Sequence, residues 1–419
     1  MGLLGIFIAL TLLIGLAYRG WSVLLLAPAA ALVAALFAME PLLAHWTHTF
    51  MDSTAGFLAQ FFPLFLLGAL FGKLMDDSGS VTAIARFMSG KLGPRHAVLA
   101  VVLAGALVTY GGVSLFVAFF VLAPMALALF RDAGIPGHLA PGAIWLGAAS
   151  FTMSAMPGTP AIQNAIPMPF FGSTPFAAPG LGLIASVIML VFGLWWMGLR
   201  VAKVKRQVQP AAPPESCSSD PDGAVEDPLI RERSSVVQNF DPAEMHHGHR
   251  SPDQPSTLIA FLPLIVVILV NLLMSLVVLP RLDLSFLGEE RWGPTSLQVV
   301  GGIWSVIIAL FTAILVLLLT NASRLVQVRE SMDAGANASV LPALSVASLV
   351  GFGAVVAALP AFELVREWVL SIEGGPLVSL AVSTTILSAL TGSASGGMTI
   401  ALESLGATYL QMATAIGMD

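Results

Sequence analysis

Charged residues are scarce in this sequence. Asp, Glu, Lys and Arg make up 10% of its 419 residues, whereas a soluble globular protein carries about 25%. Hydrophobic residues make up 57%, in several apolar runs of 17 or more residues. Each such run is long enough to cross a bilayer about 30 Å thick. The composition therefore predicts an all-α polytopic membrane protein, and no nucleic-acid-binding pattern accompanies it.

Cysteine is nearly absent as well. Cys217 is the only one, so no internal disulfide can form. It lies in the one long polar segment, 200–256, whose Pro, Ser, Asp and Glu content predicts a disordered linker. The tract His246–His249 in this linker favours a solvated segment over a metal site, because no Cys or carboxylate cluster completes a ligand set. We expect neither a metal nor a cofactor.

The apolar runs predict the order of the elements. The N-terminus lacks the basic region of a cleaved signal and predicts a retained first span. Spans are expected near 2–18, 21–39, 54–74, 139–154, 178–199, 257–279, 296–320 and 339–360. Short surface helices are expected at 80–90, with Asp77-Ser78 as its cap, and at 362–373. The predicted domains are N-terminal spans at 1–53, a first transport repeat at 54–199, the linker at 200–256, scaffold spans at 257–335 and a second transport repeat at 336–419.

Two apolar stretches, 97–130 and 376–419, are too long for one span and lack a polar loop that would divide them into two. The first is interrupted at Thr109–Ser114 and the second at Thr391–Gly397. Gly costs about 1 kcal/mol in a helix interior, so these interruptions break the helix. A broken backbone at bilayer depth is tolerated where it is buried in protein or lines a wet cavity. We therefore expect two re-entrant hairpins, and the alternative is a Gly/Ser seam for close helix packing.

The basic residues predict the orientation. Lys73, Arg86, Arg131, Arg200 and Arg324 all fall on one side if the linker is cytoplasmic, as the positive-inside rule requires. Arg281, Arg291 and Arg366 then fall outside, against the rule. In this topology the two hairpins enter from opposite faces, and each follows a Phe-Gly pair, at Phe71 and at Phe352. That is the inverted repeat of a secondary transporter, with its site where the breaks meet near the midplane.

The motifs around these breaks resemble the gluconate permease (GntP) family over most of the chain outside the linker. The similar segments are Phe71–Gly79, Thr109–Val117, Met156–Asn164, Phe171–Thr174, Ala178–Gly182, Gly351–Gly353 and Gly392–Gly397. The resemblance implies a proton-coupled importer of gluconate or related hydroxy acids in the bacterial inner membrane, with an inverted-repeat fold. Members of the family usually continue into a further broken helix, whereas this sequence stops at Asp419. We therefore expect the C-terminal end to be truncated.

The breaks predict the substrate-binding residues. No Lys or Arg lies mid-span, so a carboxylate would be met by backbone N–H groups at half-helix starts and by hydroxyls. The candidates are Tyr110, Gly111, Gly112, Ser114, Gly158, Thr159, Gln163, Asn164, Ser393, Ser395, Gly396 and Gly397. Pro157, Gly158 and Pro160 predict a further break, within a broken helix at 139–164. Gln163 and Asn164 can instead cap a helix after this break. Tyr110 can instead be an interfacial aromatic, and Asn271 favours a helix–helix contact over a ligand.

Coupling follows from charge. A monoanion entering a negative interior works against about 2.3 kcal/mol per 100 mV, and one proton carried with it makes the movement neutral. H⁺ is therefore the expected coupling ion. The candidate proton carriers are Asp76, Asp77 and Glu363, and the alternative for each is a surface charge at a helix end.

Other functions fit the sequence less well. An intramembrane serine hydrolase lacks a His placed to activate Ser393 or Ser395, so no enzyme is expected. A channel would only equilibrate its substrate. A Na⁺-coupled di- or tricarboxylate transporter of the citrate type would favour a basic residue in the site. Gluconate, other sugar acids, glycerate, 3-hydroxybutyrate and D-serine are not distinguished. The expected partners are a small carboxylate, the lipid bilayer and, since related folds are often dimers, a second copy of the chain.

Overall fold

The computed structural model describes residues 2–17, 19–113, 115–207, 254–292, 295–370, 372, 375–391, 394–415 and 417. Most of the predicted linker, and the candidate residues Ser114 and Ser393, lie outside these ranges. All regular secondary structure within them is helical, which confirms the predicted all-α class. Five of the described helical stretches are long and apolar enough to cross a membrane.

The first half contains two N-terminal helices, one very long helix, a two-helix hairpin, a broken segment and a further long helix. Their bounds are α1 (Gly2–Ala17), α2 (Val23–Phe37), α3 (Leu42–Ala44), η1 (His45–Phe50), α4 (Met51–Asp77), α5 (Ser80–Leu92), η2 (Pro94–His96), α6 (Ala97–Tyr110), α7 (Leu115–Asp132), η3 (Gly137–Leu139), α8 (Ala140–Trp145), η4 (Leu146–Ser150), α9 (Phe151–Ser154), α10 (Ile162–Ala165), α11 (Pro167–Phe171) and α12 (Pro179–Gln207). The helices α6 and α7 are the predicted first hairpin, broken where the glycines stand.

The second half repeats the first part of this order. Its elements are α15 (Thr257–Leu273), η5 (Met274–Val278), η6 (Leu279–Arg281), η7 (Ser285–Gly288), η8 (Glu290–Trp292), α16 (Leu297–Thr320), α17 (Val328–Ala358), α18 (Phe362–Leu370), α19 (Gly375–Thr391) and α20 (Ala394–Ala415). Two helices, a long helix, a short helix and a hairpin occur in each half. The second hairpin, α19 and α20, is divided between Thr391 and Ala394, inside the predicted interruption, whereas Ser395–Gly397 belong to the first turn of α20.

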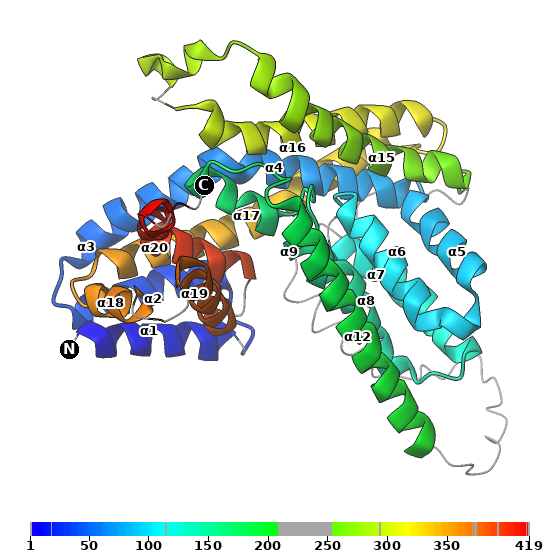
Figure 1. The fold of residues 1–419 in the computed structure, drawn as a ribbon, viewed down its shortest axis with the longest axis horizontal. Coiled ribbons are helices and arrows are strands. Elements are labelled where there is room, and N and C mark those ends of the chain that lie inside the picture. The colour runs from blue at the N-terminus through cyan, green and yellow to red at the C-terminus, as the bar shows by residue number, and fades with distance from the viewer. Residues whose placement is uncertain are drawn as a thin grey trace.

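The long helices α4 and α17 pack along each other through the middle of the molecule (Figure 1). Gly351 lies against Phe50 and Thr54, whereas Gly335 lies against Leu70 and Lys73. The later residue of α17 thus meets the earlier part of α4, so the two helices are antiparallel. Glycines at both contacts let the backbones approach closely. The two halves have the same order of elements, and their central helices run in opposite directions. The predicted inverted repeat requires this arrangement.

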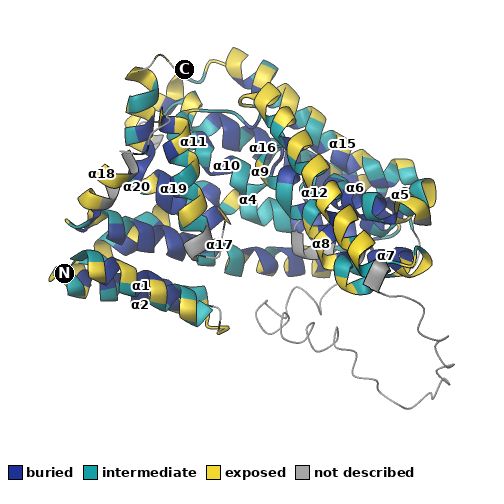
Figure 2. Ribbon diagram, turned by 60° about the horizontal axis from the view of Figure 1, so that its bottom comes forward, coloured by how far each residue is buried: buried dark blue, intermediate teal, exposed yellow. Residues whose placement is uncertain are grey.

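Each hairpin has its own buried core. One cluster joins α4, α5, α6, α7, α15 and α16, and the other joins α1, α2, α17, α19 and α20. The helix α20 takes part in both, with Leu402 in the first cluster and Ile400 and Leu405 in the second. It therefore packs between the two halves, beside α10 and α11 (Figure 2).

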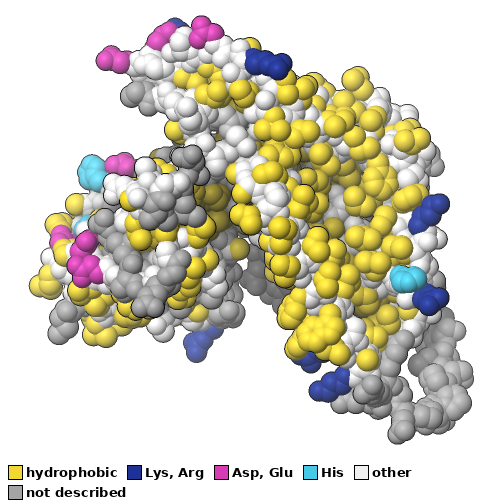
Figure 3. Space-filling view, viewed as in Figure 1, with side chains coloured by type: hydrophobic (Ala, Val, Ile, Leu, Met, Phe, Trp, Pro, Cys, Tyr) yellow, Lys and Arg dark blue, Asp and Glu magenta, His cyan; other side chains and the backbone are white. Residues whose placement is uncertain are grey.

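The surface is that of a membrane protein. In the most apolar stretch of α12 only 11% of residues are buried inside the protein, and Ile184, Ile188 and Trp195 are among its exposed side chains. Figure 3 shows a broad hydrophobic area on this face, with Lys and Arg gathered mainly toward one end of it. So large an apolar surface is stable in lipid, whereas in water it would drive association.

Two local expectations are corrected, and a third needs little change. The surface helix expected at 80–90 is present as α5, with Val81 and Ile84 buried against its neighbours and Arg86 and Lys91 exposed, and it ends two residues later, at Leu92. Asp77-Ser78 does not cap it, because Asp77 ends α4 and the N-cap is Gly79 in a left-handed conformation. The predicted span at 339–360 begins at Val328, since α17 continues through a charged turn that hydropathy excluded; the domain boundaries proposed at 54 and 336 therefore fall inside α4 and α17.

Candidate functional site

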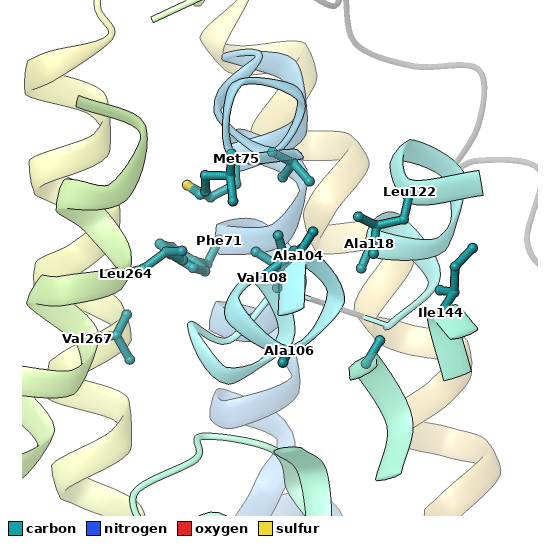
Figure 4. Packing of buried hydrophobic residues seen from close by; sticks show 14 of the residues in the cluster. Phe71, Met75, Ala104, Ala106, Val108, Ala118, Leu122, Ile144, Leu264 and Val267 are labelled. Carbon is teal, nitrogen blue, oxygen red and sulfur yellow. The ribbon is translucent and has the colours of Figure 1, made fainter. Parts of the chain in front are cut away.

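The tip of the first hairpin lies halfway along two spanning helices. A Cβ at Gly111 would fall 2.1 Å from Leu264, and one at Gly112 would fall 3.1 Å from Leu310. Leu264 and Leu310 stand near the middle of α15 and α16, so the tip ends near mid-depth. Gly112 has φ +97°, a conformation that favours glycine, which explains why the helix breaks here. Figure 4 shows Leu264 beside Phe71 of α4.

The broken segment between α9 and α10 is bound to this tip. The Tyr110 hydroxyl donates to the Pro157 carbonyl at 2.7 Å, which makes Tyr110 part of the break rather than an interfacial aromatic. The Gly112 Cβ position lies 3.1 Å from Pro160. The tertiary structure thus brings Tyr110–Gly112 and Pro157–Pro160, which are separate in the sequence, into one site.

Three polar contacts fix the shape of the broken segment. Gly158, with φ +82°, donates its N–H to the Pro175 carbonyl at 2.7 Å. Asn271 of α15, fully buried, donates its Nδ2 to the Gly158 carbonyl at 3.0 Å. Asn271 therefore holds neighbouring elements together, as expected, although its partner is a loop carbonyl. Its Oδ1 accepts no hydrogen bond from the described residues.

The remaining predicted residues of this segment divide into two roles. Asn164 donates its Nδ2 to the Thr159 and Pro175 carbonyls, so its amide N–H₂ group holds the loop instead of facing a ligand. Gln163 has a buried Oε1 without a hydrogen-bond partner among the described residues. Thr159 is 1% exposed, and its hydroxyl accepts the Ala161 N–H at 3.3 Å. Gln163 and Thr159 thus keep polar atoms at the break.

The second break is followed directly by the first turn of α20. Ser395, Gly396 and Gly397 are buried there, and the Thr399 hydroxyl donates to the Ser395 carbonyl at 2.7 Å. A Cβ at Gly397 would lie 2.2 Å from the Ser388 backbone nitrogen, so the two helices of the hairpin touch through their backbones. The positive end of the α20 dipole is located at this turn.

The two breaks are linked through the segment that follows the first. Gly406 of α20 lies against Phe170 of α11, and α20 also contacts α10, which carries Gln163 and Asn164. The atoms nearest to a Cβ at Gly397 belong to Leu387 and Ser388 of its own hairpin. The structure therefore joins the first tip to 157–164 directly, and joins the second hairpin to that segment through the side of α20.

The three predicted proton carriers differ in their burial and in their partners. Asp77 is fully buried and its Oδ1 lies 2.9 Å from the Lys73 ammonium, while its Oδ2 has no hydrogen-bond partner among the described residues. Asp76 is 8% exposed, and Glu363 is exposed in the first turn of α18. Asp76 and Asp77 are therefore buried, not surface charges. Glu403, a lone carboxylate within the apolar helix α20, was not among the predicted carriers and is exposed.

Replacing Tyr110 with phenylalanine tests the coupling of the first tip to the broken segment. One neutral hydrogen bond contributes about 1 kcal/mol, so uptake is expected to fall about fivefold while protein abundance stays unchanged. Tyr409→Phe is the control, because the Tyr409 hydroxyl lies within hydrogen-bond distance of Ser379 and Ser383 inside the second hairpin, whereas the Tyr110 hydroxyl binds the broken segment. Equal uptake by Tyr110→Phe and the wild type would contradict a role for this bond.

The fold and site define a class. A helical membrane protein with antiparallel central helices, two broken hairpins and a mid-depth break lined by glycine and hydroxyl groups is a secondary transporter in architecture. The chain belongs to the GntP permease family, whose model matches residues 1–209. It is 38% identical over 419 residues to the uncharacterized transporter YxjC of Bacillus subtilis (strain 168), spanning 98% of this chain and 84% of that protein. It is 33% identical over 131 residues to the high-affinity gluconate transporter of Escherichia coli (strain K12), spanning 31% of this chain and 28% of that one.

Proposed function

We propose that this permease imports gluconate or a related small hydroxycarboxylate together with a proton. The observation that carries the proposal is the break at Tyr110–Gly112 and Pro157–Pro160, placed near mid-depth between spanning helices. Such a break offers backbone and hydroxyl groups to a small polar ligand where the lipid offers none. The name of the Escherichia coli relative supports gluconate as the first substrate to test.

The charge of the site favours a monoanion. Within α6, α10, α19 and α20 the sequence has no Lys or Arg. A tricarboxylate would lose the hydration of three carboxylate groups there, and helix termini alone would not compensate for that loss. A single carboxylate with several hydroxyls is better matched, since the hydroxyls can bond to groups such as Thr159 and Gln163. Short-chain hydroxy acids and D-serine remain members of the panel to be tested.

A proton gradient is expected to drive accumulation. Purified protein in proteoliposomes should concentrate labelled gluconate when the outside is acidic, about tenfold for each pH unit at one proton per anion. An uncoupler should collapse the gradient of gluconate, whereas a Na⁺ gradient alone should produce none. Equilibration without accumulation would indicate a channel, and Na⁺-driven accumulation would contradict proton coupling.

A substrate panel completes this test. Uptake of labelled gluconate should be inhibited by other C4–C6 hydroxy monocarboxylates and only weakly by citrate. Empty liposomes and liposomes with the Gly397→Ala variant serve as controls for leak. Failure of every hydroxy monocarboxylate to be taken up or to compete would refute the substrate class.

A further inference from the structure

A cavity of about 160 Å³ lies apart from the predicted binding residues, where α16 begins. Its wall is made by the turn after α11, with Ser173 and Thr174, by Ser275 of η5, by the start of η6, and by the first turns of α16. A water molecule takes about 30 Å³ of liquid volume, so the space equals about five waters and admits a small organic acid. Gln298 is exposed at its rim, so the cavity opens to the surface of the protein.

One buried side chain in this cavity lacks a partner. Ser275 is 6% exposed, and its hydroxyl makes no hydrogen bond to any of the described residues. A buried hydroxyl left without a partner costs about 1–3 kcal/mol, so a ligand atom that satisfied it would be stabilised there. The cavity therefore has a specific polar position available.

The start of α16 adds donors to the same wall. Backbone hydrogen bonds of the first turn begin with Val299 and Val300, which both donate to Ser296. The N–H groups of Leu297 and Gln298 precede these bonds, and Ser296 makes no side-chain cap. The first turn contains no acidic residue, so no carboxylate in that turn neutralises the positive end of the dipole of this 24-residue helix. A carboxylate is the ligand that such a wall favours.

The cavity adjoins the mid-depth break. Ser275 follows Asn271 by one turn, and Asn271 donates to the Gly158 carbonyl. On the other wall Thr174 precedes Pro175, whose carbonyl accepts both the Gly158 N–H and the Asn164 amide. The two walls of the cavity thus continue directly into the two contacts that hold the broken segment.

The cavity lies at the end of the spanning stretch Thr257–Arg281 that is opposite Arg86, and Arg281 lies at this same end. The first residues before α15 are bound to α5, since Arg86 donates to Gln254 at 2.8 Å. Ser275 is at the opposite end of the spanning stretch Thr257–Arg281. If the end with Arg86 is cytoplasmic, as the positive-inside rule predicts, the cavity opens outward.

We propose that this cavity is an outer binding site that receives the carboxylate of the substrate before it passes to the mid-depth break. The class of ligand is a small hydroxycarboxylate, which rests on the proposed function. The carboxylate accepts hydrogen bonds from Ser275 and from the first N–H groups of α16, and the substrate hydroxyls face Ser173, Thr174 and Gln298.

Thiol protection tests the site without relying on transport. In a Cys217→Ser background, Ser275→Cys is exposed from outside to an anionic methanethiosulfonate reagent, with and without gluconate, 3-hydroxybutyrate or acetate. Modification is expected to occur and to slow at least fivefold with the preferred carboxylate. Ser285→Cys, exposed in η7 near the same end of α15 but outside the cavity wall, should react quickly and show no protection. Absence of reaction at Ser275→Cys, or reaction that no carboxylate slows, would overturn the site.

Kinetics of Ser275→Leu separate this site from the proposed function. Filling the cavity is expected to raise the apparent KM for external gluconate about tenfold and to leave the KM for efflux unchanged. The control Thr312→Val removes a hydroxyl that bonds to Ile308 within α16 and does not line the cavity. Uptake by the wild type with an unchanged external KM in Ser275→Leu would refute the outer site alone. Failure of the wild type to transport any hydroxy acid would refute the proposed function, and the thiol protection would still decide the site.

Discussion

Gly397→Ala is expected to abolish uptake while the protein still inserts into the membrane. The added Cβ would stand 2.2 Å from the Ser388 nitrogen and 2.3 Å from its Cα, both rigid backbone atoms of α19. The hairpin must therefore open by about 1 Å at its tip, and a displacement of this size in a binding site costs about 100-fold in rate. Initial uptake in proteoliposomes measures the loss, and immunodetection of membrane-inserted protein normalises it.

Gly406→Ala is the matched control, since it lies in the same helix. Its Cβ would be 3.4 Å from the edge of the Phe170 ring, an ordinary contact with a side chain. Uptake should stay within about twofold of the wild type, because such a contact displaces no backbone. Near-normal uptake by Gly397→Ala would show that the tip of the second hairpin does not contribute to the site.

Lys73→Met is expected to destabilise the protein by about 3–5 kcal/mol, because it leaves the Asp77 carboxylate buried without its cation. The side chains of Lys73 and Asp77 are 12% and 0% exposed, and their N–O distance is 2.9 Å. Thermal unfolding in detergent, read from intrinsic fluorescence, should show a clear fall in Tm. The double variant Lys73→Met/Asp77→Leu should recover most of it, since neither charge is then left alone.

The pair Arg329 and Asp333 provides the control at the same spacing. It lies at 3.7 Å with side chains 94% and 68% exposed, so Arg329→Met should change stability by no more than about 0.5 kcal/mol. The folded double variant also tests coupling. If Asp77 carries the proton, that variant binds gluconate and no longer accumulates it in a pH gradient. Normal accumulation would assign the pair a structural role and leave Asp76, Glu363 and Glu403 as candidates.

Much of the local architecture was predictable from the sequence because lipid imposes strong constraints. Apolar runs of fixed length predicted α1, α2, α15 and α16 closely, and glycines placed both hairpin breaks. The start of α17 was wrong, since a helix that extends beyond the lipid carries charges that hydropathy excludes. The burial of Asp77 was also missed, because the sequence does not show whether a carboxylate is solvated by water or paired with a buried cation such as Lys73.

The sequence by itself determined that the chain is helical and membrane-embedded, where it breaks, and that the breaks are without basic side chains. These properties follow from residue composition along one segment at a time, since every backbone group in lipid must be satisfied within its own helix. Only the tertiary structure decided that Tyr110 meets Pro157, that Asn271 holds Gly158, and that Ser275 adjoins the start of α16. Those contacts join residues 47 and 113 positions apart in the first two cases. They depend on which helices pack together, and no periodicity within one segment contains that information.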